Sequence, residues 1–315
     1  MSSPNTLSQT FYGLGPDNLW KQLIDGQYHD LGPDVFDKGK HGRHIEPGFL
    51  RGVTEGAAYA VEALSSSDIS VEIYKEIHKK ACSHFNGTRE SGTGASDSGG
   101  KFRYNVYVQE TYEAHLWGAN KEEKEIMRNC SYVYQLGAHI MKDPDDLENL
   151  SAAYNKWSRP KWEALDSNRD QVVSIMARTF KTAAALNIAS KGHGINFQSH
   201  PDAIVVRFEA VKDLEETVPS LFKEFNEKIS ATSNRDEKLK LIAQLYQTLE
   251  WKHPPSDGTT RTDYILLNAL LCKYGFNPAI LDDPAYATLH TLEDWIQNLE
   301  KGMEAWRVEK AKCDQ

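Results

Sequence analysis

Residues 253–261 carry the side chains of this 315-residue chain that are best suited to chemistry. They read His-Pro-Pro-Ser-Asp-Gly-Thr-Thr-Arg, so an imidazole, a carboxylate, a glycine and a guanidinium follow one another within nine residues. Imidazole exchanges protons near neutral pH, a carboxylate holds divalent cations, and a guanidinium offers paired donors to phosphate oxygens. Residue types in this order are suited to group transfer from a phosphate-bearing donor.

The second half of this segment is suited to binding an anion. Gly258, Thr259 and Thr260 lead into a predicted helix, so their backbone N–H groups are among those that have no partner inside the helix. Such donors, together with the helix dipole, attract phosphate groups. Arg261 adds a planar fork of N–H donors that matches phosphate oxygens. We therefore expect Gly258, Thr259, Thr260 and Arg261 to hold an anionic donor.

Asp257 and His253 complete the predicted site. Asp257 would hold a Mg²⁺ ion that bridges the donor's phosphates, with water completing the metal shell. His253 would act as the general base toward an attacking hydroxyl, a role that typically contributes about 10²–10⁴ in rate. The same residues also fit a purely structural interpretation. In that interpretation histidine before proline is a turn residue, and Asp-Gly-Thr-Thr is an ordinary helix start with threonine caps.

Two predicted core helices must position this segment. Upstream, residues 237–250 place apolar side chains three or four positions apart, which is the period of one buried helix face. Downstream, residues 262–274 are apolar on nearly every side and stop at Gly275, a pattern typical of a helix in the middle of a domain. Because both ends of the segment join these helices, we expect it to be held firmly in place.

The segment resembles the active-site motif of the Fic (Fido) family. That motif reads His-Pro-Phe-x-Asp/Glu-Gly-Asn-Gly-Arg-x-x-Arg and lies between two core helices. The matching positions in this chain are His253, Pro254, Asp257, Gly258 and Arg261. Residues 214–226 resemble the helix before the family's catalytic unit, and residues 73–85, with Glu76-Ile-His at the centre, resemble an early family helix. Clear resemblance covers roughly residues 205–290, and a weaker one covers 60–109.

Members of that family mostly transfer AMP from ATP to a hydroxyl of a target protein, and a minority transfer other phosphate-containing groups. The resemblance implies that His253 is the general base and Asp257 the Mg²⁺ ligand. It also implies that the turn at Gly258 cradles the phosphates of a nucleotide or nucleotide-like donor and that Arg261 grips them. The implied partners are that donor and a protein acceptor with a Ser, Thr or Tyr hydroxyl.

The chain departs from the family pattern at four motif positions. Pro255 stands in place of Phe, Thr259 and Thr260 in place of Asn and Gly, and Tyr264 in place of the second Arg. Asp263 also adds a negative charge near the helix start, where it would compete with a bound anion. Three readings stay open: an ATP-using AMP transferase, a relative that uses a sugar nucleotide or a phosphodiester such as CDP-choline, and a catalytically silent nucleotide- or peptide-binding protein. A fourth interpretation is that the similarity to the family arose by chance.

A flap that lays target peptide across the site by strand addition is a further family feature. Residues 101–108 alternate as a strand does, and their Gly-x-x-Arg start resembles the flap. We therefore assign Lys101, Phe102 and Arg103 to target binding. The rival strand is residues 203–209, which lie closer in sequence to the catalytic helices.

Composition limits the other function classes. The 45 acidic against 36 basic residues, a net charge of −9, argue against general nucleic-acid binding. No apolar stretch approaches the roughly 18–20 residues that span a bilayer. The four cysteines form no framework, and the first residues do not read as a secretory signal. We expect a cytoplasmic protein, either in its own cell or, as a delivered effector, in another.

The expected fold is mainly α, a Fic-like helical core with a small β-hairpin flap and a helical insertion. An extended leader covers residues 1–50, the core covers 51–109 and 200–315, and the insertion covers 110–199. Within the insertion we expect helices at 121–141, 144–157, 160–165 and 168–190. The insertion would help to choose the target or the donor.

Overall fold

The computed structural model of the chain describes residues 7–38, 46–84, 100–102, 108–113, 183–193, 195–199, 203–208, 213–255 and 257–315. Contacts divide the chain into two compact units. The first contains residues 1–106, 211–288 and 292–315, and the second contains 107–210 and 289–291. The predicted insertion, 110–199, lies inside the second unit.

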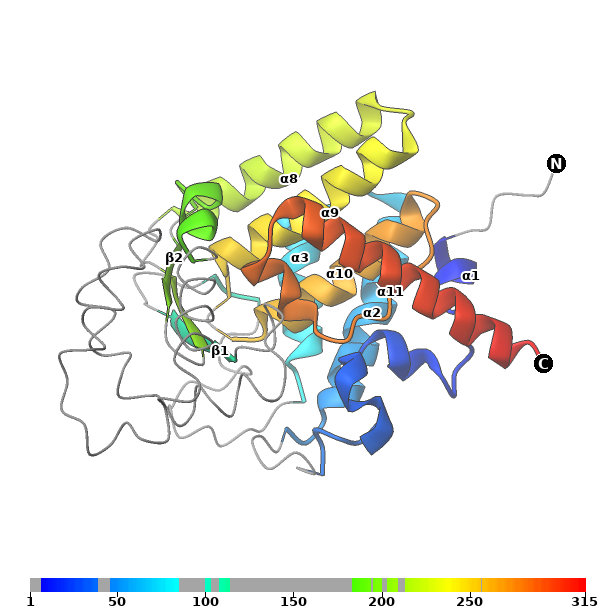
Figure 1. Ribbon diagram of the computed structural model, residues 1–315. Coiled ribbons are helices and arrows are strands. Elements are labelled where there is room, and N and C mark those ends of the chain that lie inside the picture. Colours follow the sequence, from blue (N-terminus) through cyan, green and yellow to red (C-terminus); the bar gives the residue numbers. More distant parts are fainter. Residues whose placement is uncertain are drawn as a thin grey trace, which may run out of the picture. The chain divides into compact units, whose positions relative to one another are not determined.

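The first unit is helical. Its elements are α1 (Leu7–Phe11), η1 (Leu19–Gln22), η2 (Gly26–Leu31), α2 (Phe49–Ser66), α3 (Val71–Ala81), α8 (Leu214–Ala231), α9 (Arg235–Lys252), α10 (Thr259–Lys273), η6 (Pro284–Leu289, whose last residue belongs to the second unit) and α11 (Leu292–Cys313) (Figure 1). Together with one small antiparallel sheet, these helices confirm the prediction of a mainly α fold.

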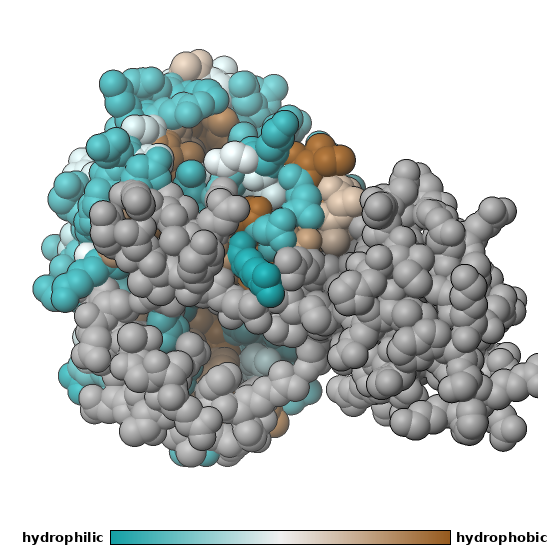
Figure 2. All heavy atoms as spheres, turned by 90° about the vertical axis from the view of Figure 1, so that its left-hand side faces the viewer, coloured by the Kyte–Doolittle hydropathy of each residue, from teal (hydrophilic) through white to brown (hydrophobic). Residues whose placement is uncertain are grey.

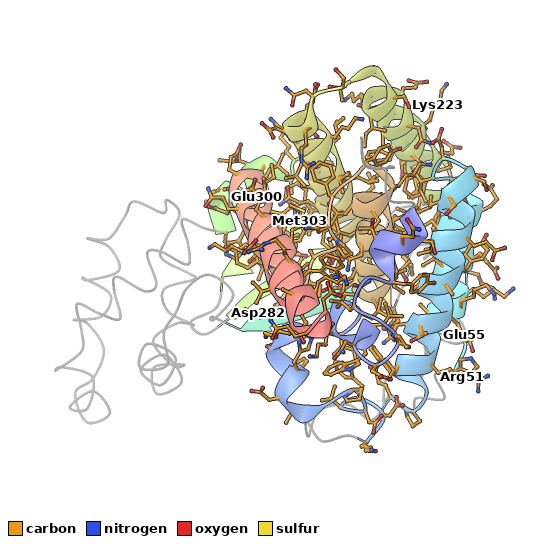
Figure 3. All side chains as sticks on the ribbon, turned by 90° about the vertical axis from the view of Figure 1, so that its right-hand side faces the viewer. Arg51, Glu55, Lys223, Asp282, Glu300 and Met303 are labelled. Carbon is orange, nitrogen blue, oxygen red and sulfur yellow. The ribbon has the colours of Figure 1, made fainter. Side chains whose placement is uncertain are left out.

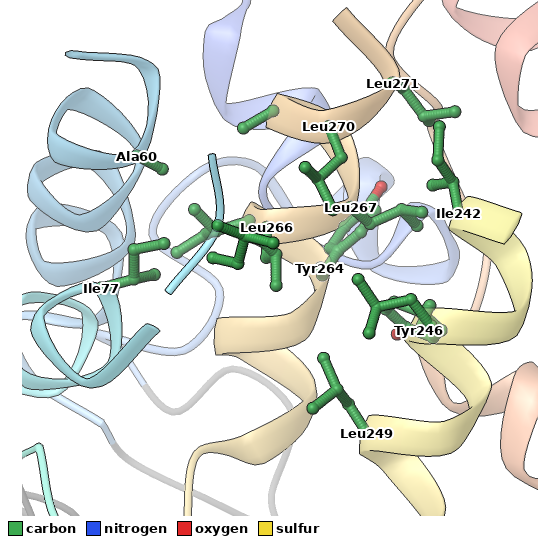
Figure 4. Packing of buried hydrophobic residues seen from close by; sticks show 14 of the residues in the cluster. Ala60, Ile77, Ile242, Tyr246, Leu249, Tyr264, Leu266, Leu267, Leu270 and Leu271 are labelled. Carbon is green, nitrogen blue, oxygen red and sulfur yellow. The ribbon is translucent and has the colours of Figure 1, made fainter. Parts of the chain in front are cut away.

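Helix α10 lies at the centre of the first unit. It packs against α1, α2, α3 and α9, and every residue from Thr262 to Cys272 is buried. Figure 4 shows Leu266 on the side of α10 that faces Ile77 of α3, and Leu271 on the side that faces Ile242 of α9. A helix that is apolar all round needs such neighbours on several sides, which confirms the central position predicted for it.

Polar side chains mark where two of the neighbouring helices, α9 and α3, begin. Asn234 caps α9 by accepting a hydrogen bond from the Glu237 N–H at 3.1 Å. Ser70 caps α3 by accepting from the Ile73 N–H at 3.3 Å. Ser65 lies inside α2, where its hydroxyl donates to the Val61 carbonyl at 2.6 Å.

The N-terminal residues do not form an extended leader. Residues 7–38 contain α1, η1 and η2 and contribute Phe11 and Ile24 to the core. Gln22 ties this segment down: its side-chain N–H donates to the Phe11 carbonyl at 2.9 Å, and its Oε1 accepts from the Trp306 indole of α11 at 2.8 Å. The prediction missed this because apolar residues separated by irregular turns lack a regular period.

The second unit contains a three-stranded antiparallel sheet. Its strands are β1 (Val108–Glu113), β2 (Ile195–Ser199) and β3 (Ala203–Phe208), in the order β1-β3-β2. Phe208 lies opposite Val108 on one side and Ile195 on the other. Of the rival segment, 203–209, residues 203–208 are therefore the central strand of the sheet.

The preferred flap strand, residues 101–108, begins later than predicted. Lys101 and Phe102 are not in a strand, and β1 starts only at Val108. Phe102 packs on α3 instead: its ring centroid is 6.1 Å from that of Tyr74, and the Lys75 ammonium lies 4.3 Å from it. These contacts bury the ring against a helix, which strand pairing would not do. Arg103 lies outside the described residues.

Most of the predicted insertion lies outside the described residues. The helices predicted at 121–141, 144–157 and 160–165 all do, and of the one at 168–190 only the end is described, with residues 183–189 helical. Among the described residues, no helix is both long and apolar enough to cross a membrane.

The described surface is largely hydrophilic. On the face in Figure 2, apolar residues show only in small areas between polar ones. Charged pairs follow the outer sides of the helices, such as Arg51 and Glu55 on α2, whose Nε and Oε1 are 3.0 Å apart (Figure 3). The apolar side chains are thus concentrated in the core, where they fix the position of α9 and α10.

Candidate functional site

The junction between α9 and α10 begins at His253. This residue caps α9 in the left-handed conformation, with φ 45° and ψ 61°, and its N–H donates to the Leu249 carbonyl at 2.8 Å. Among the described residues it is the only non-glycine with positive φ. Side chains rarely adopt this conformation, and Pro254 prevents the helix from continuing. The side chain is buried, with 3% exposure. Backbone strain at such a position motivates a functional hypothesis.

The other side of the junction begins at Gly258, where glycine is required for two reasons. Its φ of 75° is left-handed, and a methyl group added there would come 2.7 Å from Sγ of Cys82 on α3. Its carbonyl accepts from both the N–H and the hydroxyl of Thr262, at 3.1 and 2.8 Å. Gly258 therefore opens α10 while packing directly on the end of α3.

Polar side chains at the junction are engaged with the protein itself. Asp257 Oδ1 accepts from the Gly258 N–H at 2.7 Å. The Thr259 hydroxyl donates to the Pro255 carbonyl at 3.2 Å, and the Thr260 hydroxyl donates to Glu250 Oε2 at 3.0 Å. The hydroxyls thus brace the turn from inside, and the Gly258 N–H, which was expected to bind an anion, is already bonded to Asp257.

Arg261 forms a buried ion pair with Glu46. Its Nη2 lies 2.6 Å from Glu46 Oε2, and the two side chains are only 10% and 6% exposed. Its guanidinium also stacks over Phe49 at the start of α2, 4.7 Å from the ring centre. Burial disfavours the charged form, but the adjacent Glu46, with Cys82 and Asp257 nearby, holds the pKa of Arg261 above its ordinary value. The predicted phosphate-binding fork is therefore charged and already holds a carboxylate.

A second buried carboxyl group lies next to this turn. Asp263 Oδ1 accepts from the Tyr74 hydroxyl of α3 at 2.7 Å, and Glu250 of α9 lies close enough to act on its pKa. Both carboxyl groups are at most 1% exposed. Burial disfavours the ionised form of each group, because water does not reach it to stabilise the charge.

The sequence predicts an ionised carboxylate at Asp263, but burial favours its protonated form. Desolvation raises the pKa of Asp263 to about 8, against hydrogen bonds to Tyr74 and Glu250 that lower it. Near neutral pH the group is mostly protonated, so it does not compete with an anion as a full negative charge. The reason is tertiary: α3 and α9 cover this side of α10 and exclude water.

Tyr264 serves the core rather than the junction. Its hydroxyl donates to the Ala279 carbonyl at 3.0 Å and accepts from the Leu281 N–H at 3.0 Å, and its side chain is buried. A cation at this position would be buried in the core. Tyr264 thus ties α10 to the residues that follow it.

His78 of α3 joins the junction from the other side. Its Nε2 lies 2.9 Å from the Asp257 carbonyl oxygen, and its Nδ1 accepts from the Gly100 N–H at 3.0 Å. Burial lowers the pKa of His78, and the charge of Arg261 lowers it further, against the hydrogen bond to Asp257. A neutral buried imidazole thus connects the turn to the start of the predicted target-binding segment.

The structure brings together most of the predicted site residues. One junction contains six of them: His253, Asp257, Gly258, Thr259, Thr260 and Arg261. His78 connects this junction to Gly100, and Lys101 and Phe102 follow Gly100 directly. In the part of the chain that the structure describes, no group of three or more His, Cys, Asp or Glu side chains could hold a metal ion by itself. A metal bound through Asp257 would need ligands from the donor.

Sequence reasoning missed three participants: Glu46, Glu250 and the bridging role of His78. Glu46 lies 215 residues from Arg261, and no local pattern signals such a contact. Glu250 falls on the predicted α9, where a charged residue at the buried face was the one available signal. For His78 the signal was the resemblance of its helix to an early family helix.

Comparison with models of known protein families and with curated proteins finds no match for this chain.

Proposed function

We propose that the α9–α10 junction is the active site of a Fic-like transferase. It would move AMP, another nucleotide or another phosphate-linked group onto a hydroxyl of a target protein. The observation that supports this most is the frame of the site: two buried helices hold His253 and Gly258 in left-handed conformations on either side of one short turn. Such a frame fixes a base and a helix start close together, and pre-organised geometry of this kind is what group transfer requires.

In the proposed step the acceptor's hydroxyl oxygen attacks a phosphorus atom of the donor, and the bond from that phosphorus to the leaving phosphate breaks. His253 takes the hydroxyl proton as the oxygen–phosphorus bond forms. The leaving phosphate carries away the bonding electron pair. The backbone N–H groups at the start of α10 stabilise the negative charge on the transferred group.

Arg261 binds the donor's phosphates in this proposal after exchanging partners. Its guanidinium holds the Glu46 carboxylate at 2.6 Å, and a phosphate offers oxygens of the same spacing and more negative charge. One anion would therefore replace another on a cation that stays charged. Mg²⁺, arriving with the phosphates, would bind Asp257 and neutralise charge on the leaving group.

The second candidate is a catalytically silent protein that binds a nucleotide or peptide at the same junction. The Glu46–Arg261 pair favours it, because both side chains are nearly buried and His253 is only 3% exposed. A junction that must open before a donor reaches these side chains suits a binding switch as well as an enzyme.

Donor consumption and binding, measured together, test both candidates. The purified chain is incubated with Mg²⁺ and labelled ATP, a UDP-sugar or CDP-choline, and label on added proteins is followed beside the thermal shift. A donor at about 100 times its Kd stabilises by about 2.7 kcal/mol. His253→Asn tolerates the left-handed conformation but is no base, so it should abolish transfer and keep the shift. His29→Asn is the control for replacing a histidine outside the junction, since the His29 ring hydrogen-bonds the Ile24 carbonyl in the N-terminal segment.

Transfer that survives His253→Asn would exclude the proposed mechanism. A thermal shift without transfer by the natural chain would favour the silent protein, and the lack of any shift with all donors would exclude both.

A further inference from the structure

His78 makes two hydrogen bonds to backbone groups that are far apart in the sequence. The Gly100 N–H can only donate, so Nδ1 of His78 must carry no proton. The ring proton of a neutral imidazole then lies on Nε2, which is 2.9 Å from the Asp257 carbonyl oxygen. The two backbone partners thus select one tautomer, and that tautomer satisfies both of them.

The Gly100 end of this contact belongs to a short segment that docks along α3. Gly100 has φ 72°, and a methyl group added there would come 3.2 Å from the Lys75 carbonyl oxygen. Two residues on, the Phe102 ring lies under the Lys75 ammonium and beside Tyr74. Residues 100–102 are therefore held by backbone and ring contacts on one helix.

The Asp257 end belongs to the turn that opens α10. A methyl group at Gly258 would come 3.5 Å from His78 Nε2, so the imidazole lies directly against this turn. The charged groups that act on the ring are Arg261 and Asp257 from the junction, and the thiol of Cys82, the residue that caps α3, lies against the same Gly258. With Arg261 charged, a second cation at the ring is disfavoured, which keeps the imidazole neutral.

We propose that His78 is a positioning residue: its neutral Nε2–H form ties the Asp257–Gly258 turn to Gly100 and so sets where residues 100–102 lie relative to the donor-binding turn. The catalytic consequence, correct placement of the acceptor, rests on the proposed function, but the connection itself does not.

Two variants separate the two ends. In His78→Asn the side-chain Oδ1 takes the position of Nδ1, which keeps an acceptor for Gly100 and removes the bond to Asp257. In His78→Gln the amide nitrogen takes the position of Nε2, which keeps the donor to Asp257 and leaves Gly100 without its acceptor. His29→Gln is the control, since that ring nitrogen is 3.0 Å from the Ile24 carbonyl in η2.

Hydrogen exchange measured by mass spectrometry on the whole chain reads out both ends. His78→Gln should speed exchange at Gly100 about five- to tenfold, the effect expected for one lost neutral hydrogen bond, and His78→Asn should not. Equal Gly100 exchange in all variants would overturn the proposal.

Nitrogen NMR of the natural chain gives an answer even if a variant fails to fold. The imidazole resonance that disappears in either His78 variant belongs to His78. If that resonance reports the Nε2–H tautomer, the connection is supported. If it reports the Nδ1–H tautomer, the connection is overturned. If the chain transfers label, His78→Gln should raise KM for the protein acceptor. It should not change the rate at which water hydrolyses the donor when no acceptor is present. The KM of His78→Asn should be closer to that of the natural chain. Absence of transfer would exclude the proposed function. Hydrogen exchange at Gly100 would then decide by itself whether His78 connects the turn to Gly100.

Discussion

The guanidinium of Arg261 donates to Oε2 of Glu46 at 2.6 Å, which joins the start of α10 to the residues before α2 across 215 positions of sequence. The pair is nearly buried, and Phe49 covers the guanidinium face. A buried charge that loses its partner is costly. The pair therefore contributes to stability and, in the proposed function, also controls access to the phosphate-binding fork.

Glu46→Gln should destabilise the chain and strengthen anion binding. Removing the negative charge leaves Arg261 with a neutral acceptor, which should lower the free energy of unfolding by on the order of 2–4 kcal/mol. The same change should tighten binding of inorganic pyrophosphate, because no carboxylate then competes for the fork. Urea denaturation and a thermal shift with pyrophosphate measure the two effects. Glu55→Gln, in an exposed pair with Arg51, is the control for charge alone. Pyrophosphate affinity that stays unchanged would remove Arg261 from the anion site.

The buried Asp263 should make stability fall as the pH rises. Its pKa is raised from 3.8 to about 8 on folding, so the folded state binds more protons than the unfolded state between these values. The stabilisation is complete below the unfolded pKa and is lost as the pH passes through the folded pKa, at up to about 1.4 kcal/mol per pH unit. Asp263→Asn cannot titrate and still accepts from Tyr74. Its free energy of unfolding should therefore depend less on pH than that of the natural chain in this window; parallel curves would show that Asp263 is ionised in the fold.

Gly258→Ala should be much more harmful than Gly275→Ala. Both glycines have positive φ, which costs a side chain about 1–2 kcal/mol. At Gly258 the added methyl group also meets Cys82 Sγ at 2.7 Å, whereas at Gly275 nothing lies within 4 Å. Overpacking of this kind adds about 1–3 kcal/mol. Urea denaturation of both variants measures the difference, and adding Cys82→Ala to Gly258→Ala should recover the packing part only. Equal losses at the two glycines would mean that α3 does not press on the turn.

Tyr264→Phe should destabilise the chain although it removes only one oxygen. The Leu281 N–H loses its partner in a buried place, and the Ala279 carbonyl keeps only its bond from Asn268, at a cost of about 1–3 kcal/mol. Thermal or urea unfolding measures it, with Tyr12→Phe at an exposed position as the control. A loss no larger than that of the control would show that this position is not tied to the residues after α10.

The local elements of the site could be predicted from the sequence, because they depend on short-range patterns. The apolar run at 262–274 requires a helix covered on several sides, and α10 is that helix. The glycine at 258 marks a turn into a helix, and the structure adds the reason why no side chain fits there. Prediction was weaker where the pattern was irregular, as in residues 7–38, or where two segments alternated equally well, as at 101–108 and 203–209.

By itself the sequence determined which residues stand together at the α9–α10 junction, since their spacing along the chain places them there whatever surrounds them. Only the tertiary structure decided their chemical state. Glu46 holds Arg261, α3 and α9 bury Asp263 so that its pKa rises to about 8, and His78 connects the turn to Gly100. Charge and protonation depend on burial and on partners brought from distant parts of the chain, and these are properties of the packed fold rather than of any short stretch of residues.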